Sequence, residues 1–307
     1  METFRKPRQI RHVTTEFLTQ YQQHLRKEGR AESTIKGHLQ HIRSALQWGV
    51  DNGYLEKAPK LPRIKRAKAQ KMMKGRPILL EEFERMLTAT SKVILTPNTS
   101  TSNKEREPDV ERIPSWKFLL RGLWLSGLRL GEAMDLHWTD NNCIRVDLSG
   151  KHPMFKIPGD KEKGATDRTL AMTPDFAELL LAVPKGERNG FVFNPAPMNR
   201  SGPRLTSYSV GQRISEIGEA AGVIVATKSD KVSYASAHDL RRSFGTRWAT
   251  KVMPVVLQEL MRHSSIATTL RFYVASNAAK TAADLWNSHA NRPISESSSV
   301  CEFRGQR

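Results

Sequence analysis

The N-terminal part of the chain has apolar residues at the spacing of two amphipathic helices. The pattern predicts one helix over residues 13–29 and a second over residues 33–52. The second helix has its apolar positions three to four residues apart, at Ile35, Leu39, Ile42, Leu46 and Val50. We expect Ser33 or Thr34 to cap this helix and Gly53 to end it. The sequence therefore predicts a small helical unit at this end of the chain.

The middle of the chain begins with helical patterns on either side of a polar segment. An amphipathic helix is predicted from Glu81 to Thr88, and a long apolar helix starts at Ser115. Between them, residues 92–113 are polar and rich in Ser, Thr and Asn, which predicts a loop or insertion.

Strand patterns follow, and helical patterns then return. The predicted strands are Cys143 to Leu148, Met154 to Ile157 and Thr169 to Met172, the last two as a hairpin around a turn from Gly159 to Asp167. From Pro174 onward we expect helices to dominate, ahead of a serine-rich tail that starts near Ser295. No internal repeat is visible. The prediction is a mainly α fold with a small antiparallel β-sheet, of the α+β class.

Positive charge is concentrated near the N-terminus. The formal net charge is +18, and residues 1–76 hold 18 Lys and Arg against 6 Asp and Glu. Residues 57–76 contain nine basic residues and no acidic one, and Pro59 and Pro62 oppose a helix at their start. Such a run can be a solvated tether, but its position between two folded segments favours binding to nucleic acid. Each phosphate that a basic residue neutralises releases counterions, which makes this binding favourable. We expect DNA contacts from Arg63, Lys65, Arg66, Lys68, Lys71 and Lys74.

Several classes of protein are disfavoured. The chain has two cysteines, Cys143 and Cys301, which supply neither a disulfide framework nor a cysteine metal site. The apolar runs are short and the N-terminus has no signal-like apolar core, so we expect a cytoplasmic protein without membrane contact. The acidic residues are scattered, which argues against a metal-dependent nuclease. We expect neither a cofactor nor a metal.

Candidate chemistry lies in three blocks of the C-terminal half. In WLSGLRLGE, Gly127 would end the apolar helix just before Arg129, and Glu132 could orient that arginine. In AHDLRRSFGT, His238 and Arg241 are three residues apart and so share one helix face. Taken alone, the first block could be a surface ion pair, and a bare His-x-x-Arg also arises by chance.

The third block contains a histidine and a tyrosine. In LQELMRHSSIATTLRFYV, His263 follows an amphipathic helix, Ser264 or Ser265 can cap the next helix, and Tyr273 lies at its far end. The candidate set is then Arg129, Lys163, His238, Arg241, His263 and Tyr273. Cations and donors of this kind can stabilise a pentacoordinate phosphorane while the tyrosine attacks a phosphodiester.

The order and character of these blocks resemble the catalytic domain of the tyrosine recombinases, the phage integrase family. The segment KGATDRTL resembles the family's lysine hairpin, with Lys163 ahead of Arg168 and Lys161 as the fallback. The resemblance extends over residues 10–290, because the N-terminal helical unit is similar to the family's core-binding domain. It implies a helical DNA-binding domain over 1–56, a basic linker over 57–76, a catalytic domain over 77–290 and a polar tail over 291–307. The first predicted helix starts close to Met1, so we expect no arm-binding domain ahead of it.

The chain departs from the family pattern in the third block. Members usually have glycine before the histidine, where this chain has Arg262. The spacing from His263 to the tyrosine is ten residues, whereas in many members it is nine, which would fall on Phe272. The histidine that often follows the nucleophile is absent, with Val274 in its region. We still assign Tyr273 as the nucleophile and interpret Tyr234 as structural.

The resemblance implies a site-specific recombinase that acts on double-stranded DNA through a 3′-phosphotyrosine intermediate. Arg129 and Arg241 would hold the nonbridging oxygens, His263 would donate a further hydrogen bond, His238 would accept the phenol proton and Lys163 would protonate the leaving oxygen. The family acts as a homo-tetramer whose protomers exchange C-terminal segments, here residues 277–307. In some systems DNA-bending accessory proteins take part. The resemblance also implies a location on the nucleoid. The alternatives are a type IB topoisomerase and a DNA-binding protein whose catalytic domain is unused.

Overall fold

The structure, a computed structural model, describes residues 4, 7, 9–63, 75–95, 110, 112–161, 166–197, 203–228, 231–274 and 286. The chain divides into two units, Met1–Met72 and Met73–Arg307, each with its own internal contacts.

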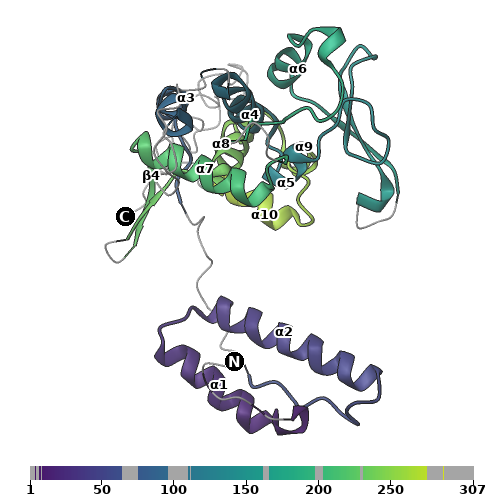
Figure 1. The fold of residues 1–307 in the computed structure, drawn as a ribbon, viewed down its shortest axis with the longest axis vertical. Coiled ribbons are helices and arrows are strands. Elements are labelled where there is room, and N and C mark those ends of the chain that lie inside the picture. The colour runs from purple at the N-terminus through teal and green to yellow at the C-terminus, as the bar shows by residue number, and fades with distance from the viewer. Residues whose placement is uncertain are drawn as a thin grey trace, which may run out of the picture. The chain divides into compact units, whose positions relative to one another are not determined.

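The first unit is a helical pair. A 3-10 turn at Ile10–His12 leads into α1 (Thr15–Lys27), and α2 (Glu32–Asp51) returns alongside it (Figure 1). Thr14 caps α1, since its hydroxyl accepts a hydrogen bond from the Phe17 N–H at 3.2 Å.

The predicted cap of the second helix is wrong. Ser33 and Thr34 lie within the first turn of α2, and Ala31 is the N-cap residue without any side-chain cap. The helix starts earlier because Arg26 of α1 donates to the Glu32 carboxylate at 2.6 and 3.1 Å, which anchors the first turn to the neighbouring helix.

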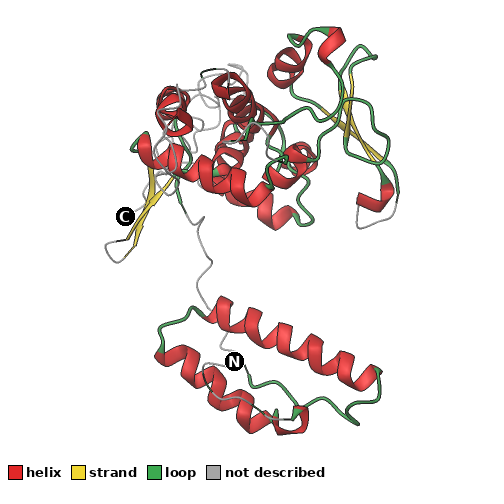
Figure 2. Ribbon diagram, in the orientation of Figure 1, coloured by secondary structure: helices red, strands yellow, loops and turns green. Residues whose placement is uncertain are grey.

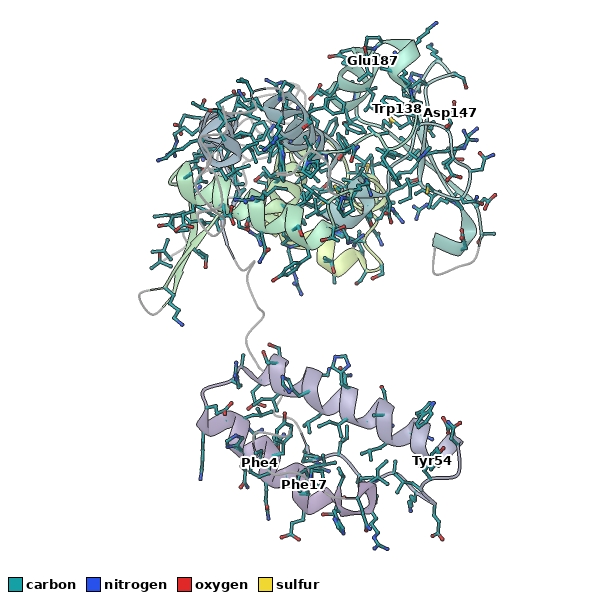
Figure 3. All side chains as sticks on the ribbon, in the orientation of Figure 1. Phe4, Phe17, Tyr54, Trp138, Asp147 and Glu187 are labelled. Atoms are coloured by element: carbon teal, nitrogen blue, oxygen red, sulfur yellow. The ribbon has the colours of Figure 1, made fainter. Side chains whose placement is uncertain are left out.

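Apolar residues of both helices form the core of this unit. It consists of Val13, Leu18, Tyr21, Leu25, Ile35, Leu39 and Leu46. The Phe4 ring packs edge-on against Phe17, with centroids 5.8 Å apart (Figure 3). The polypeptide that leaves α2 returns to α1, where the Gln22 side chain donates to the Arg63 carbonyl at 3.2 Å.

The second unit is built from helices around α4. Its helices are α3 (Leu80–Leu95), α4 (Arg112–Ser126), α5 (Leu130–Met134), α6 (Pro174–Leu181), α7 (Ser207–Ala220), α8 (Ala237–Ala249), α9 (Pro254–Leu260) and α10 (Ile266–Val274), with 3-10 turns at Gly159–Lys161 and Lys185–Glu187. Helix α4 packs against α3, α6 and α8 and is buried on most of its surface, as its continuous apolar sequence requires.

Two antiparallel sheets lie at opposite ends of the helical body (Figure 2). The larger has the order β1 (Arg145–Asp147), β2 (Met154–Ile157) and β3 (Arg168–Ala171), with Val146 opposite Phe155 and Phe155 opposite Leu170 on its buried face. The smaller pairs β4 (Ile224–Lys228) with β5 (Lys231–Tyr234), a hairpin that projects from the helices (Figure 1).

The fold class is confirmed, with two local corrections. The predicted loop at 92–113 is shorter, because Ile94 is fully buried and extends the apolar stripe of α3 to Leu95, while α4 starts at Arg112. The β4–β5 hairpin was not predicted, although strand-favouring residues flank Ser229 and Asp230, with Ile224, Val225 and Thr227 before them and Val232 and Tyr234 after them. Residues 96–109 and 111 of the predicted loop at 92–113, and the tail over 291–307, lie outside the described residues. No helix in the described part of the chain is long and apolar enough to cross a membrane.

Candidate active site

A turn between α4 and α5 positions Arg129. Helix α4 ends at Ser126, Gly127 adopts a left-handed backbone with φ of 63°, and Arg129 becomes the N-cap residue of α5. The Glu132 carboxylate accepts from the Arg129 backbone N–H at 2.9 Å and from its Nη1 at 2.7 Å. Glu132 therefore orients the half-exposed Arg129 side chain, as the sequence predicted.

Helix α8 supplies His238 and Arg241. It begins at the Ser236 cap, where Ser236 and Asp239 exchange hydrogen bonds, so His238 lies in its first turn and remains exposed. Arg241 is 4% exposed and donates to the carbonyls of Gly127 and Met261. Arg241 thus connects the turn that precedes Arg129 with the turn that precedes His263.

The turn after α9 positions His263. The N–H groups of Arg262 and His263 bond to the carbonyls of Glu259 and Gln258, and Arg262 has a φ of 50°, the arrangement of a Schellman helix end. The family's glycine at this position fits that left-handed backbone, and here an arginine adopts it. His263 Nδ1 lies 2.9 Å from the Thr269 hydroxyl. The Gln258 carbonyl holds the His263 backbone, and Thr269 of α10 holds its imidazole.

Three guanidinium groups surround one carboxylate. Glu132 Oε1 lies 2.7 Å from Arg129 Nη1 and 3.5 Å from Arg262 Nη1, and its Oε2 lies 3.9 Å from Arg241 Nη1. Burial favours a higher pKa for Glu132, but the hydrogen bonds from Arg129 and the charge of Arg262 hold the pKa below its usual value. Burial, together with the charges of Arg129 and Arg262, lowers the pKa of Arg241 to about 10, so it remains a cation at neutral pH.

Both histidines are neutral at pH 7 in this environment. Burial lowers the pKa of His263 to about 4, and the nearby charges of Arg241 and Arg129 act in the same direction. Packing around part of the His238 ring removes water from it, and this desolvation and the charge of Arg242 lower the pKa of His238. Neutral imidazoles can accept a proton through one nitrogen and donate a hydrogen bond through the other.

Tyr273 lies in a small apolar cluster next to these turns. The cluster is formed by Phe244, Leu257 and Met261, and Tyr273 packs against it from α10. The phenol donates to the Val252 carbonyl at 2.6 Å, and burial raises the pKa of the phenol. The hydroxyl is thus committed to a backbone acceptor, rather than to the cations, in this conformation.

The structure brings together five of the six predicted residues in one unit: Arg129, His238, Arg241, His263 and Tyr273. The sixth, Lys163, lies outside the described residues, as do Lys65, Arg66, Lys68, Lys71 and Lys74. The strand after Lys163 does approach the site, because Arg168 of β3 lies 3.9 Å from Glu259 of α9.

Sequence reasoning missed two residues that hold His263. Thr269 is fully buried beside the imidazole, and the Phe272 ring stacks on it with centroids 6.0 Å apart and planes 14° apart. Their helical spacing in α10 was the available signal, since residues 269 and 272 share one face. Within the described residues, no three His, Cys, Asp or Glu side chains are grouped closely enough to hold a metal ion.

Comparison with known proteins finds two family models that match this chain. The model of the phage integrase family matches residues 109–280, and the phage integrase SAM-like domain matches residues 1–67. The tyrosine recombinase XerC of Chlamydia caviae is 26% identical over 261 residues, which cover 83% of this chain and 72% of that protein.

Solved structures share the fold at low sequence identity. The Tn1549 transposon integrase in complex with transposon right end DNA has a TM-score of 0.55 at 16% identity, covering 90% of this chain and 86% of that one. A lambda integrase dimer bound to a core site has a TM-score of 0.56 at 13% identity, covering 87% and 82%. The family match covers more than half of the chain and includes all three motif blocks. This chain therefore belongs to the phage integrase family, the tyrosine-type site-specific DNA recombinases.

Proposed function

We propose that this protein cleaves and rejoins double-stranded DNA through a 3′-phosphotyrosine intermediate on Tyr273, without metal or ATP. The observation that carries the proposal is the pair of hydrogen bonds from Arg241 to the Gly127 and Met261 carbonyls. These bonds hold the Arg129 turn and the His263 turn side by side, so that cations and a neutral imidazole face one phosphate.

The reaction is a transesterification. The Tyr273 Oη attacks the scissile phosphorus and forms the P–O bond to tyrosine, while the bond from phosphorus to the 5′ oxygen breaks. The phenol proton goes to His238, and Lys163 gives a proton to the leaving 5′ oxygen. The reverse attack by a 5′ hydroxyl restores the diester, so the bond energy is conserved in the phosphotyrosine.

The cations provide the electrostatic stabilisation. Arg129 and Arg241 hold the nonbridging oxygens through their planar forks, and His263 donates a further hydrogen bond as negative charge develops. The hydrogen bond from Tyr273 to Val252 must break before attack. DNA binding therefore has to release the phenol from its backbone acceptor and bring it to the phosphate.

The same proposal assigns regions to DNA. Residues 1–56 form the DNA-binding domain, 57–76 the linker, 77–290 the catalytic domain and 291–307 the tail. The division of the chain at residues 72 and 73 and the matches of two family models support this assignment. We assign the basic residues of the linker, Arg63, Lys65, Arg66, Lys68, Lys71 and Lys74, to phosphate contacts along the duplex.

We also propose that the active form is a homo-tetramer on two DNA sites. The support is an exposed apolar strip at the start of α9, where Met253 and Val255 are 73% and 68% exposed and Val256 adjoins them. Residues 277–307 of a neighbouring protomer are the segment that we assign to this strip. DNA-bending accessory proteins would bring the two sites together. Because the proposed substrate is DNA, we assign the enzyme to the nucleoid in the cytoplasm.

Covalent trapping tests the proposal. The wild-type protein and Tyr273→Phe are incubated with nicked suicide duplexes from DNA flanking the gene and with supercoiled plasmid, in EDTA and without nucleotide. We expect a covalent adduct only with the wild type, together with recombinant joints. Relaxed plasmid without joints would instead indicate a topoisomerase, and binding without adduct in both proteins would indicate a DNA-binding protein.

A further inference from the structure

Arg262 occupies a position whose backbone favours glycine. Its φ of 50° is in the left-handed region, where an L side chain is strained. Among the described residues, it is the one residue other than glycine with positive φ. A strained residue at a functional turn calls for a compensating contact.

The Arg262 side chain makes that contact with Glu132. It is 10% exposed, and its Nη1 lies 3.5 Å from Glu132 Oε1, the oxygen that also accepts from Arg129 Nη1. The Arg262 carbonyl accepts in turn from Arg129 Nη2 at 3.4 Å. Arg129 is therefore held between Glu132 and the Arg262 backbone, and Arg262 shares Glu132 with it.

Sharing changes the charge that Arg129 presents. With Arg262, the group of Arg129, Arg241, Arg262 and Glu132 has three positive charges and one negative, a net charge of +2. Without Arg262 the net charge is +1, and Glu132 would be drawn more strongly to Arg129 and neutralise it. A phosphorane develops negative charge, so Arg129 stabilises it best when the positive charge of Arg129 is not offset by Glu132.

We propose that Arg262 is a positioning residue for Arg129: its guanidinium shares Glu132, so that the Arg129 guanidinium is directed at the phosphate and its positive charge is not fully offset by Glu132. The proposal rests on the function proposed above and assigns Arg262 no direct contact with DNA. It also accounts for an arginine at a turn that fits glycine best.

Three variants test this role. Arg262→Gly removes the side chain and relieves the left-handed backbone, so the turn is preserved. Arg262→Lys restores the charge at the same backbone cost. Arg85→Gln is the matched control, because Arg85 is ion-paired with Glu81 at 2.8 Å on α3, outside the site.

Two measurements are made on each protein. The first is the rate of Tyr273 adduct formation on a suicide duplex at saturating concentration, together with the duplex Kd. The second is the Nε–Hε signal of Arg129 in ¹⁵N-arginine NMR spectra without DNA, assigned with Arg129→Lys. This signal reports on Arg129 whether or not the protein cleaves DNA.

We expect Arg262→Gly to slow adduct formation by roughly 10- to 100-fold, by analogy with the loss of residues that orient metal ligands, and to shift the Arg129 signal. Arg262→Lys should recover most of the rate, Arg85→Gln should match the wild type, and the Kd should stay within about twofold. An unchanged rate or an unchanged Arg129 signal in Arg262→Gly overturns the proposal. A weaker Kd with a reduced salt dependence and an unchanged signal would make Arg262 a phosphate ligand instead. A wild type that forms no adduct while the signal shifts in Arg262→Gly refutes the proposed function and leaves the positioning role standing.

Discussion

The Tyr273 hydroxyl donates a hydrogen bond to the Val252 carbonyl at 2.6 Å, so the proposed nucleophile is hydrogen-bonded to backbone within its own unit. The bond explains how a reactive tyrosine can be kept from attack, because the acceptor holds the phenol in its neutral form. In the proposed mechanism this hydrogen bond must break before cleavage, so its contribution to the free energy of folding can be measured.

Tyr273→Phe should lower stability by about 1 kcal/mol at pH 7, the usual net value of a hydrogen bond, and abolish the adduct while DNA binding persists. Because burial raises the phenol pKa in the folded protein, its contribution to stability is complete below the unfolded pKa of about 10 and is lost as pH rises through the folded value. Urea unfolding at pH 7 and above pH 10 should show the difference between wild type and Tyr273→Phe diminishing at the higher pH. A constant difference would contradict this account of the phenol.

Position 272 should not replace position 273 as the nucleophile. Both rings pack against the cluster formed by Phe244, Leu257 and Met261, but Phe272 stacks on His263, whereas the Tyr273 hydroxyl donates to the Val252 carbonyl. The double variant Phe272→Tyr with Tyr273→Phe should form no adduct. Phe272→Tyr alone should keep its adduct on Tyr273, as peptide mass spectrometry would show. An adduct on residue 272 would reverse the assignment.

Acid should destabilise the protein through His263. Its pKa is about 4 in the folded state against 6.5 in the unfolded chain, so the unfolded state binds more protons between these values. The contribution is complete above pH 6.5 and is lost as pH falls toward 4. His263→Gln should therefore lose less stability than wild type between pH 7 and pH 4.5 in urea titrations. The exposed His152→Gln serves as the control and should follow the wild type.

Gly127 should tolerate no side chain. An added Cβ would lie 2.3 Å from the Phe244 ring, and the φ of 63° disfavours L residues. We expect Gly127→Ala to destabilise the fold by about 2–4 kcal/mol through overpacking and strain. Activity should also be lost, because a shifted turn would move the carbonyl of residue 127 away from Arg241. Gly131→Ala, where a Cβ meets no atom within 4 Å, should be neutral or stabilising in the same thermal unfolding assay.

The apolar strip on α9 should matter for assembly and not for cleavage of a single site. Met253→Lys with Val255→Lys places charges on the exposed residues without touching the core. We expect adduct formation on one suicide duplex to persist and recombination between two sites to fall at least tenfold, an order of magnitude that corresponds to about 1.4 kcal/mol of assembly energy. Light scattering of the DNA complex should show a smaller assembly. Normal recombination by this variant would remove the strip from the proposed interface.

Much of the fold followed from local patterns in the sequence. The apolar spacing located both helices of the first unit, the buried α4 and the β2–β3 hairpin, because each of these patterns reflects a single buried face. The start of α2 and the β4–β5 hairpin were not predicted. The first depends on an ion pair with α1, and the second is a short hairpin whose Ile224 and Val232 stay about 40% exposed and therefore give a weak burial pattern.

The sequence by itself determined which chemical groups the site could contain and in what order they occur along the chain. It could not determine which of them meet, because Arg241 acts through carbonyls of Gly127 and Met261, and backbone carbonyls leave no mark in a sequence pattern. Only the tertiary structure showed that Arg262 turns inward to Glu132 and that the Tyr273 phenol is held by Val252. Both contacts depend on the path of the chain between distant turns, which packing of the whole unit decides.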